Sequence, residues 1–165
     1  MIDDIDRTIL MLLQENARIS NAEISRRVEM VPSAVFERIR KLEARGLIRG
    51  YETRLSPKDL GLGLVAFIYV RGEEQVGSME VGELLSKIPE VQEVHHIAGE
   101  DCYLLKVRTA DTDALGRLLR EKIGCLDQVR STRTTIVLET IKEDARVPLP
   151  VPPVVVPVPV LEVVS

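Results

Sequence analysis

Three amphipathic helical segments occupy the start of the sequence, and only three residues separate the last two, which constrains the fold more than any other feature. Apolar side chains recur at i, i+4, i+7 and i+8 between residues 3 and 15, and this period predicts a helix. A capping box beginning at Ser20 predicts a second helix that runs to about Val28. Pro32 suits the first position of a third helix, which ends before Gly46. This arrangement is a helix-turn-helix.

The third predicted helix separates an apolar stripe from a polar face. Val35, Ile39 and Leu42 recur at helical spacing and are expected to face the core. Residues off this stripe are candidates for facing DNA, because the last helix of such a motif enters the major groove. They are Ser33, Ala34, Phe36, Glu37, Arg38, Arg40 and Lys41, with Arg49 beyond the helix end. The solvated face of any surface helix would show the same pattern.

Charge is unevenly distributed along the chain, whose net charge is −4. Residues 1–60 hold 11 basic and 10 acidic side chains, whereas the rest of the chain holds 11 and 16. Residues 32–49 hold five basic side chains against two acidic ones, so phosphate is expected to meet the third helix. The strongest candidates for phosphate or guanine contacts are Arg38, Arg40 and Lys41. Glu37 could accept a hydrogen bond from cytosine or repel DNA.

A strand or small β-wing is predicted over residues 48–55, where apolar and polar residues alternate and Pro57 closes the segment. This wing would complete a winged helix-turn-helix DNA-binding domain over residues 1–56. Residues 57–63 are then expected to be a linker.

The second half of the chain has a different order of elements, namely strand, helix, strand, strand, helix, strand. The expected strands are 64–70, 91–98, 103–107 and 129–141, with one helix ending before Pro89 and another starting at Asp111 or Thr112. This order is a split βαβ, in which a four-stranded antiparallel sheet carries both helices on one face. The predicted fold class is therefore α+β, with a ferredoxin-like βαββαβ domain over residues 64–146.

The sheet face without helices is expected to need a cover. Alternate strand residues such as Phe67 and Tyr69 make both faces of the sheet apolar. We therefore expect a homodimer that pairs sheet to sheet.

The last segment, residues 147–165, is a Pro/Val-rich tail that contains six of the nine prolines. Prolines at this density exclude helix and central strand and favour polyproline II or an extended arm. Two alternatives stay open, a disordered tail or an arm docked against a neighbouring subunit.

A candidate effector site lies at the turn between the second and third predicted strands of the second domain. Gly99, Glu100, Asp101, Cys102 and Tyr103 offer backbone N–H groups, two carboxylates and a phenol, which together could hold the ammonium and carboxylate of a free amino acid. A plain acidic hairpin turn is the alternative. Hydroxyl donors could be added by Thr132, Thr134 and Thr135, although threonine is common in strands for its β-propensity.

Catalytic and metal chemistry find no support in the sequence. His95 and His96 are adjacent in a predicted strand and point to opposite faces, so they cannot form a two-histidine metal site. Cys102 and Cys125 lack ligand spacing and are read as reduced thiols. No nucleophile with a base, phosphate loop or pair of catalytic acids is present, and we expect no cofactor. Without a leader peptide or membrane span, the expected location is the cytoplasm.

Two separate sets of residues resemble the Lrp/AsnC, or feast/famine, family of prokaryotic transcriptional regulators. The first set comprises residues 3–10, Leu13-Gln14, residues 16–21, Pro32-Ser33-Ala34-Val35, Arg38-Ile39, Leu42-Glu43, Gly46-Leu47-Ile48 and Gly50-Tyr51. The second set, residues 99–107 and 131–138, is similar to the effector-binding domain of that family. The resemblance covers about residues 2–143 and implies a dimer, often assembled into octamers, that binds double-stranded promoter DNA and responds to an amino acid at subunit interfaces.

The chain departs from the family pattern in the turn before the third helix. Val31 stands where the family usually has a capping Ser, and Glu29 stands where a turn glycine is frequent, so the turn is expected to be less stable by about 1 kcal/mol. Glu37 replaces a common Arg, which affects DNA affinity or sequence choice.

Two alternative functions remain at the level of sequence. Sirohaem decarboxylases, which are similar to this family, keep the architecture and act on a tetrapyrrole, but two histidines and a basic third helix fit that class poorly. The other alternative is a metabolite sensor with vestigial DNA binding, which Glu37 and the weak cap suggest.

Overall fold

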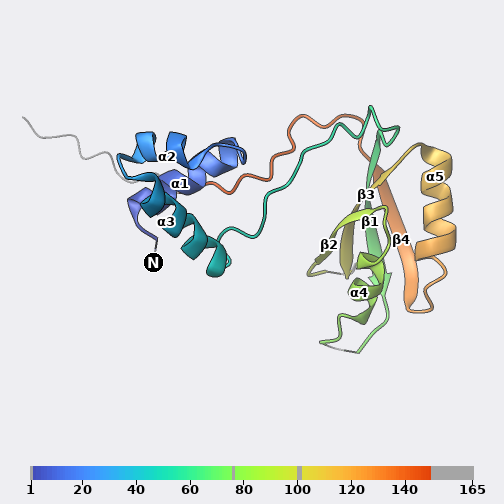
Figure 1. The fold of residues 1–165 in the computed structure, drawn as a ribbon. Coiled ribbons are helices and arrows are strands. Elements are labelled where there is room, and N and C mark those ends of the chain that lie inside the picture. The colour runs from blue at the N-terminus through green and yellow to red at the C-terminus, as the bar shows by residue number, and fades with distance from the viewer. Residues whose placement is uncertain (1, 76, 100–101, 150–165) are drawn as a thin grey trace, which may run out of the picture. The chain divides into compact units, whose positions relative to one another are not determined.

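The computed structural model describes residues 2–75, 77–99 and 102–149, and the chain forms two compact units (Figure 1). One unit contains the residues up to Thr53 together with the described residues from Asp144 onward, and the other spans Arg54–Glu143. No helix in the described ranges is long and apolar enough to cross a membrane.

The first unit is built from three helices, α1 (Asp4–Glu15), α2 (Asn21–Val28) and α3 (Pro32–Ala44). The predicted start signals of α2 and α3 are confirmed in part, because the Glu23 carboxylate pairs with Arg26 and Arg27 and does not complete the capping box. The side chain of Ser20 accepts a hydrogen bond from the backbone N–H of Glu23, and Pro32 occupies the first turn of α3. The core of this helical unit is formed by fully or almost fully buried side chains from all three helices, namely Ile9, Leu12, Ile24, Val35, Ile39 and Leu42. The apolar stripe predicted for the third helix is therefore confirmed.

The second unit is a four-stranded antiparallel sheet with strand order β2-β3-β1-β4. Along the chain its elements are β1 (Leu64–Gly72), α4 (Glu80–Ser86), β2 (Val91–His96), β3 (Tyr103–Thr109), α5 (Thr112–Arg117), the π-helical continuation η1 (Leu118–Ile123) and β4 (Val129–Ile136). This order and topology are those of the predicted ferredoxin-like domain.

Both helices of the sheet unit cover the same sheet face. Residues directly opposite on paired strands point to one face, and Ile68 of β1 lies opposite Leu105 of β3. Both are fully buried in one core with Val81 and Leu85 of α4 and with Leu115 of α5. Figure 1 shows α4 and α5 lying against the sheet. The opposite sheet face, called the open face below, carries Phe67 and Tyr69 of β1.

Three strand predictions were wrong, two because the strand is shorter than predicted and one because no strand forms. β2 ends at His96 instead of Ala98, and β4 ends at Ile136 instead of Ile141. Ile136 pairs with Ala66, and β1 begins only two residues earlier at Leu64, so a strand that continued to Ile141 would extend past the start of β1. Residues 48–55 form no strand, because no described segment of the chain pairs with them. The alternating pattern there was real, but a strand also needs a hydrogen-bonding neighbour.

After the second unit the chain returns to the helical unit. The side-chain amide of Gln14 in α1 holds the backbone of Val147 in both directions, accepting from its N–H at 2.7 Å and donating to its carbonyl at 3.2 Å. Leu149 packs against the helical core. The remainder of the predicted tail, residues 150–165, lies outside the described residues.

Candidate DNA-binding and effector-binding sites

The outward face of α3 collects most of the predicted DNA-binding residues. Because Val35, Ile39 and Leu42 point into the core, the side chains on the other side of the helix are exposed. The exposed candidates on the helix are Ser33, Phe36, Glu37, Arg40 and Lys41, and Ala34 is half-buried. Arg49 is exposed beyond the helix end. Arg40 keeps 71% of its side-chain surface accessible, with Glu37 at 4.0 Å as a loose ion-pair partner.

Arg38 differs from the other basic candidates because it is engaged inside the helical unit. Its Nη1 donates to a carboxylate oxygen of Asp3 and to one of Asp6, each at 2.7 Å. These hydrogen bonds raise the pKa of Arg38. The pKa of Asp3 is lowered, first by the hydrogen bond from the backbone N–H of Asp6 and then by Arg38.

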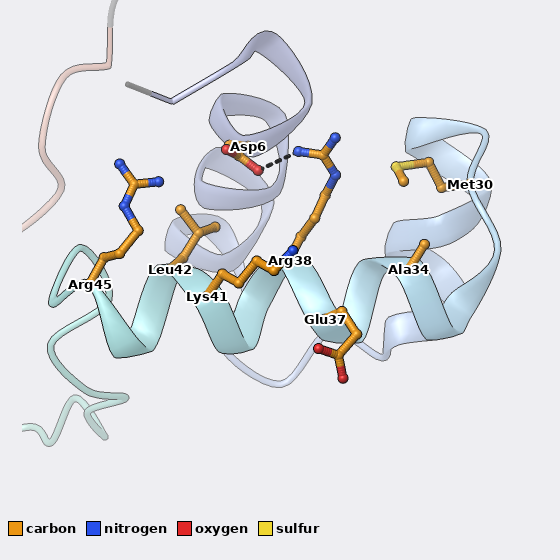
Figure 2. A pocket seen from close by; sticks show the side chains of 8 residues that line it. All are labelled: Asp6, Met30, Ala34, Glu37, Arg38, Lys41, Leu42 and Arg45. Atoms are coloured by element: carbon orange, nitrogen blue, oxygen red, sulfur yellow. Dashed lines mark hydrogen bonds and ion pairs between the residues drawn. The ribbon is translucent and has the colours of Figure 1, made fainter.

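An open hollow of about 340 Å³ lies along one flank of α3 (Figure 2). Three basic residues spaced three or four positions apart, Arg38, Lys41 and Arg45, line it. Figure 2 shows the Arg38 guanidinium turned toward Asp6 of α1, whereas the Lys41 and Arg45 side chains lie along the same flank. Arg45 was not among the predicted site residues. Its spacing from Arg38 and Lys41 was a usable signal, since residues three and four apart share a helix face.

The turn between α2 and α3 is strained and uncapped, in line with the departures seen in the sequence. Glu29 adopts a left-handed conformation with φ 54° and ψ 42°, which favours glycine. Val31 holds the N-cap position of α3 and provides no side-chain hydrogen bond. Pro32 partly offsets the missing cap, because it has no N–H to satisfy.

The segment after α3 is fixed by one side-chain contact. The hydroxyl of Tyr51 donates to a carboxylate oxygen of Glu43 at 2.9 Å. Burial, followed by this hydrogen bond, raises the pKa of Tyr51 to about 12. The contact anchors the start of the connecting segment beside the C-terminal end of α3.

The predicted effector turn is only partly described. Gly99 has a φ of 137°, a conformation that side-chain-bearing residues rarely adopt. Glu100 and Asp101 lie outside the described residues. Cys102 is half-buried, and its backbone N–H donates to the carbonyl of Val70 at 3.0 Å. This bond ties the end of the turn to the end of β1.

Tyr103 is a core residue, with 1% of its surface exposed. Its hydroxyl donates to Glu74 at 2.6 Å, and the other carboxylate oxygen of Glu74 accepts from the backbone N–H of Val81 at 3.2 Å. Burial and the bond to Glu74 raise the pKa of Tyr103 to about 12. Burial opposes ionisation of Glu74, yet hydrogen bonds led by that of Tyr103 leave its pKa lowered. Sequence reasoning missed Glu74, for which no periodic signal exists.

The three predicted threonines lie on different faces of β4. Thr134 and Thr132 lie opposite Ile68 and Val70, which are buried under the helices. Thr135 lies opposite Phe67 on the open face. The structure therefore does not bring the three hydroxyls together.

The open face combines aromatic rings with paired charges. The guanidinium of Arg133 stacks over the ring of Tyr69, 4.1 Å from its centroid. Lys106 lies opposite Phe67, with 15% of its side chain exposed, and it pairs with Glu93 and Glu143. These ion pairs raise the pKa of Lys106, the bond to Glu143 contributing most. This face presents apolar and cation–π surface together with charges that already have partners.

Metal-binding geometry is absent from the part of the chain that the structure describes, where no group of three or more His, Cys, Asp and Glu side chains could hold an ion. Cys102 and Cys125 are free thiols.

Three packed helices that present a basic outer face, followed by a βαββαβ sheet domain, define a helix-turn-helix protein with an attached ligand-binding domain. A winged helix-turn-helix DNA-binding model matches residues 2–49, and an Lrp/AsnC ligand-binding-domain model matches residues 65–147. The chain belongs to the Lrp/AsnC family, as its sequence motifs had indicated.

Similar proteins include curated relatives and solved structures. The leucine-responsive regulatory protein of Escherichia coli (strain K12) is 40% identical over 148 residues, which cover 88% of this chain and 90% of the relative. A transcriptional regulator from Neisseria meningitidis in complex with L-Met is 33% identical with a TM-score of 0.82, covering 90% and 97% of the two chains. A feast or famine regulatory protein from M. tuberculosis complexed with L-methionine is 35% identical with a TM-score of 0.81, covering 88% and 98%.

Proposed function

We propose that this chain regulates transcription by binding double-stranded promoter DNA through the outward face of α3, in response to a free amino acid. Residues 1–56 would bind DNA, and residues 64–146 would bind the effector and form the dimer. Residues 57–63 would connect these two domains. The observation that carries the proposal is the orientation of α3, whose buried stripe leaves Arg40 and Lys41 exposed in a helix-turn-helix.

The exposed side chains of α3 have different roles in this proposal. Arg40 and Lys41 contact phosphates or guanine, and Arg49 contacts phosphate beyond the helix. Ser33, Ala34 and Phe36 approach the groove near the helix start. Glu37 lowers the affinity for DNA, because its carboxylate repels the phosphates.

The test of DNA binding is footprinting across the genomic DNA of the source organism, followed by affinity measurements on recovered fragments at several salt concentrations. Specific sites and an affinity that falls steeply with salt are expected. Binding without salt dependence or site preference would instead favour a sensor whose DNA-binding surface is vestigial.

The proposed assembly is a homodimer that pairs through the open face, with higher oligomers such as an octamer built from dimers. Phe67 and Tyr69 supply the aromatic surface that such interfaces favour. Two copies of α3 would then reach successive major grooves about 34 Å apart. Light scattering of the full chain should show a dimer or larger, and Phe67→Asp should shift it toward monomer.

The proposed effector is an amino acid with an apolar side chain. Support comes from relatives named as leucine-responsive or solved with L-methionine. We propose that the site includes Gly99, Cys102 and Thr135. Glu100 and Asp101, which lie outside the described residues, would complete it. The other predicted residues lie on the sheet face that the helices cover and would support the site from that side. They are Tyr103, Thr132 and Thr134.

Scanning fluorimetry with each of the twenty amino acids tests this assignment. At least one apolar amino acid should raise the melting temperature and shift the oligomer distribution, since a ligand stabilises the state it binds. Asp101→Ala should remove both responses. A flat response to all twenty would remove the effector assignment while leaving DNA binding intact.

Two further parts of the proposal concern chemistry and location. We propose that the chain is not an enzyme and acts in the cytoplasm. Its relatives are named as regulators, which supports this part of the proposal. A change in the visible spectrum of sirohaem on mixing with the protein, followed by turnover, would support the enzyme instead.

A further inference from the structure

The start of α1 and the middle of α3 are joined by one network of three charged side chains. Asp3 and Asp6 form a capping box, in which the backbone N–H of Asp6 donates to Oδ1 of Asp3 at 2.7 Å and that of Asp3 donates to Oδ2 of Asp6 at 3.4 Å. The other oxygen of each carboxylate accepts from Nη1 of Arg38 at 2.7 Å. All four carboxylate oxygens are therefore engaged, two in the cap and two with Arg38.

Burial gives this network a structural role. The side chain of Asp6 is 12% exposed and that of Arg38 is 28% exposed. The buried Asp6 carboxylate, if it loses its cation, is left poorly solvated beside the carboxylate of Asp3, which is unfavourable. The helical unit therefore depends on Arg38 to hold the two acidic residues at the start of α1.

The same network makes Arg38 a poor phosphate ligand. Two carboxylates already neutralise its charge, and a DNA phosphate would have to compete with both at 2.7 Å. Lys41 lies about one turn further along the same flank of α3 and is exposed, whereas Arg38 is half-buried. Neighbouring basic residues on one helix flank thus have different environments.

We infer that Arg38 is a positioning residue, which fixes α3 against the start of α1 through Asp3 and Asp6 and does not itself contact DNA. This inference rests on the proposed DNA-binding function and reverses the role that the sequence alone gave to Arg38. Arg38 would affect DNA binding indirectly, because it determines where the exposed side chains of α3 lie.

Two pairs of variants separate positioning from contact. Arg38→Ala should weaken binding to a recovered promoter fragment about tenfold without changing the slope of log affinity against log salt. Lys41→Ala should lower the magnitude of that slope by about one, as expected for one lost phosphate contact. Should Arg38→Ala fail to fold, Arg38→Gln replaces it.

Asp6→Asn and Glu37→Gln form the second, matched pair, because each removes one negative charge from the helical unit. Removing an exposed acid next to DNA should tighten binding, and this is the result expected for Glu37→Gln. Asp6→Asn should weaken binding, because the amide holds Arg38 less firmly. Tighter binding by Asp6→Asn, or a slope reduced by about one in Arg38→Ala, would overturn the inference.

Amide hydrogen exchange tests the inference without DNA. Backbone amides of α3 should lose protection in Arg38→Ala and keep it in Lys41→Ala. Unchanged protection in Arg38→Ala would overturn the positioning role. If the wild-type protein showed no salt-dependent DNA binding, the proposed function would be rejected. The positioning role of Arg38 would still stand, because hydrogen exchange is measured without DNA.

Discussion

The two compact units treat their predicted site residues differently. In the helical unit, Arg40 and Lys41 point outward from a core that their own helix helps to form. In the sheet unit, Tyr103 is buried and bonded to Glu74, and the hydroxyl-bearing residues of β4 divide between two faces. The helical unit therefore presents most of its candidate groups to solvent, whereas the sheet unit uses Tyr103 to hold the sheet and α4 together through Glu74.

This difference follows from geometry. A helical period identifies both the buried stripe and the exposed face, so one pattern gives both the core and the candidate surface. A turn between strands carries no such period, and whether its side chains bind a ligand or the protein depends on neighbours from other elements. A change near Tyr103 should consequently affect stability first, whereas a change at Arg40 should affect binding first.

The largest effect is expected from Gly82→Ala in α4. A Cβ on Gly82 would lie 2.6 Å from Cε1 of the buried Tyr103 ring, so the sheet unit should lose about 1–3 kcal/mol. Gly116→Ala in α5 is the control, since its nearest neighbour is the end of the flexible Arg120 side chain at 3.2 Å. Denaturant unfolding followed by amide exchange in each unit provides the measurement. Equal stability of the two variants would contradict the packing of Tyr103 on α4.

A stabilising change of about 1 kcal/mol is expected from Glu29→Gly in the turn between α2 and α3. Glycine adopts the left-handed conformation of Glu29 without steric cost. Val31→Ser should add a similar amount by capping α3, because Val31 is 63% exposed and little apolar burial is lost. Thermal unfolding of each single variant measures the gain. A lower midpoint for Glu29→Gly would show that the side chain of Glu29 makes a contact worth more than the strain.

The two tyrosine–carboxylate pairs should respond differently to alkaline pH. Tyr51 and Tyr103 both have a pKa raised to about 12, so each favours folding below pH 10 and loses that contribution as pH rises toward 12. Tyr103→Phe should cost about 1 kcal/mol at neutral pH and flatten the alkaline decline of the sheet unit. Tyr51→Phe should have little effect, because Tyr51 is 50% exposed. A larger loss of stability in Tyr51→Phe than in Tyr103→Phe would contradict this expected difference between the two pairs.

A small effect is expected where the chain returns to α1. Gln14→Ala removes both hydrogen bonds to Val147 and should cost the helical unit about 0.5–1 kcal/mol, since the bonds lie near solvent. The amide of Val147 should lose protection against hydrogen exchange. Full protection in Gln14→Ala would mean that Leu149 alone holds the segment.

Much of the fold followed from periodicity and start signals. The capping Ser20, the first-turn Pro32 and the stripe Val35-Ile39-Leu42 act locally, so neighbouring residues were enough to predict α2 and α3. The βαββαβ order likewise appears in the sequence. The missing strand over residues 48–55 could not be foreseen, because a strand depends on a partner elsewhere. The partnership of Arg38 with Asp3 and Asp6 joins residues more than 30 positions apart, so no local pattern reveals it.

The salt dependence of promoter binding by Arg40→Ala tests the central claim most directly. Arg40 is 71% exposed on α3, away from the buried stripe. Compared with the wild-type protein, the variant should bind more weakly and lower the magnitude of the slope of log affinity against log salt by about one, with an unchanged thermal midpoint. An affinity and a slope equal to those of the wild-type protein would show that the outward face of α3 does not bind DNA.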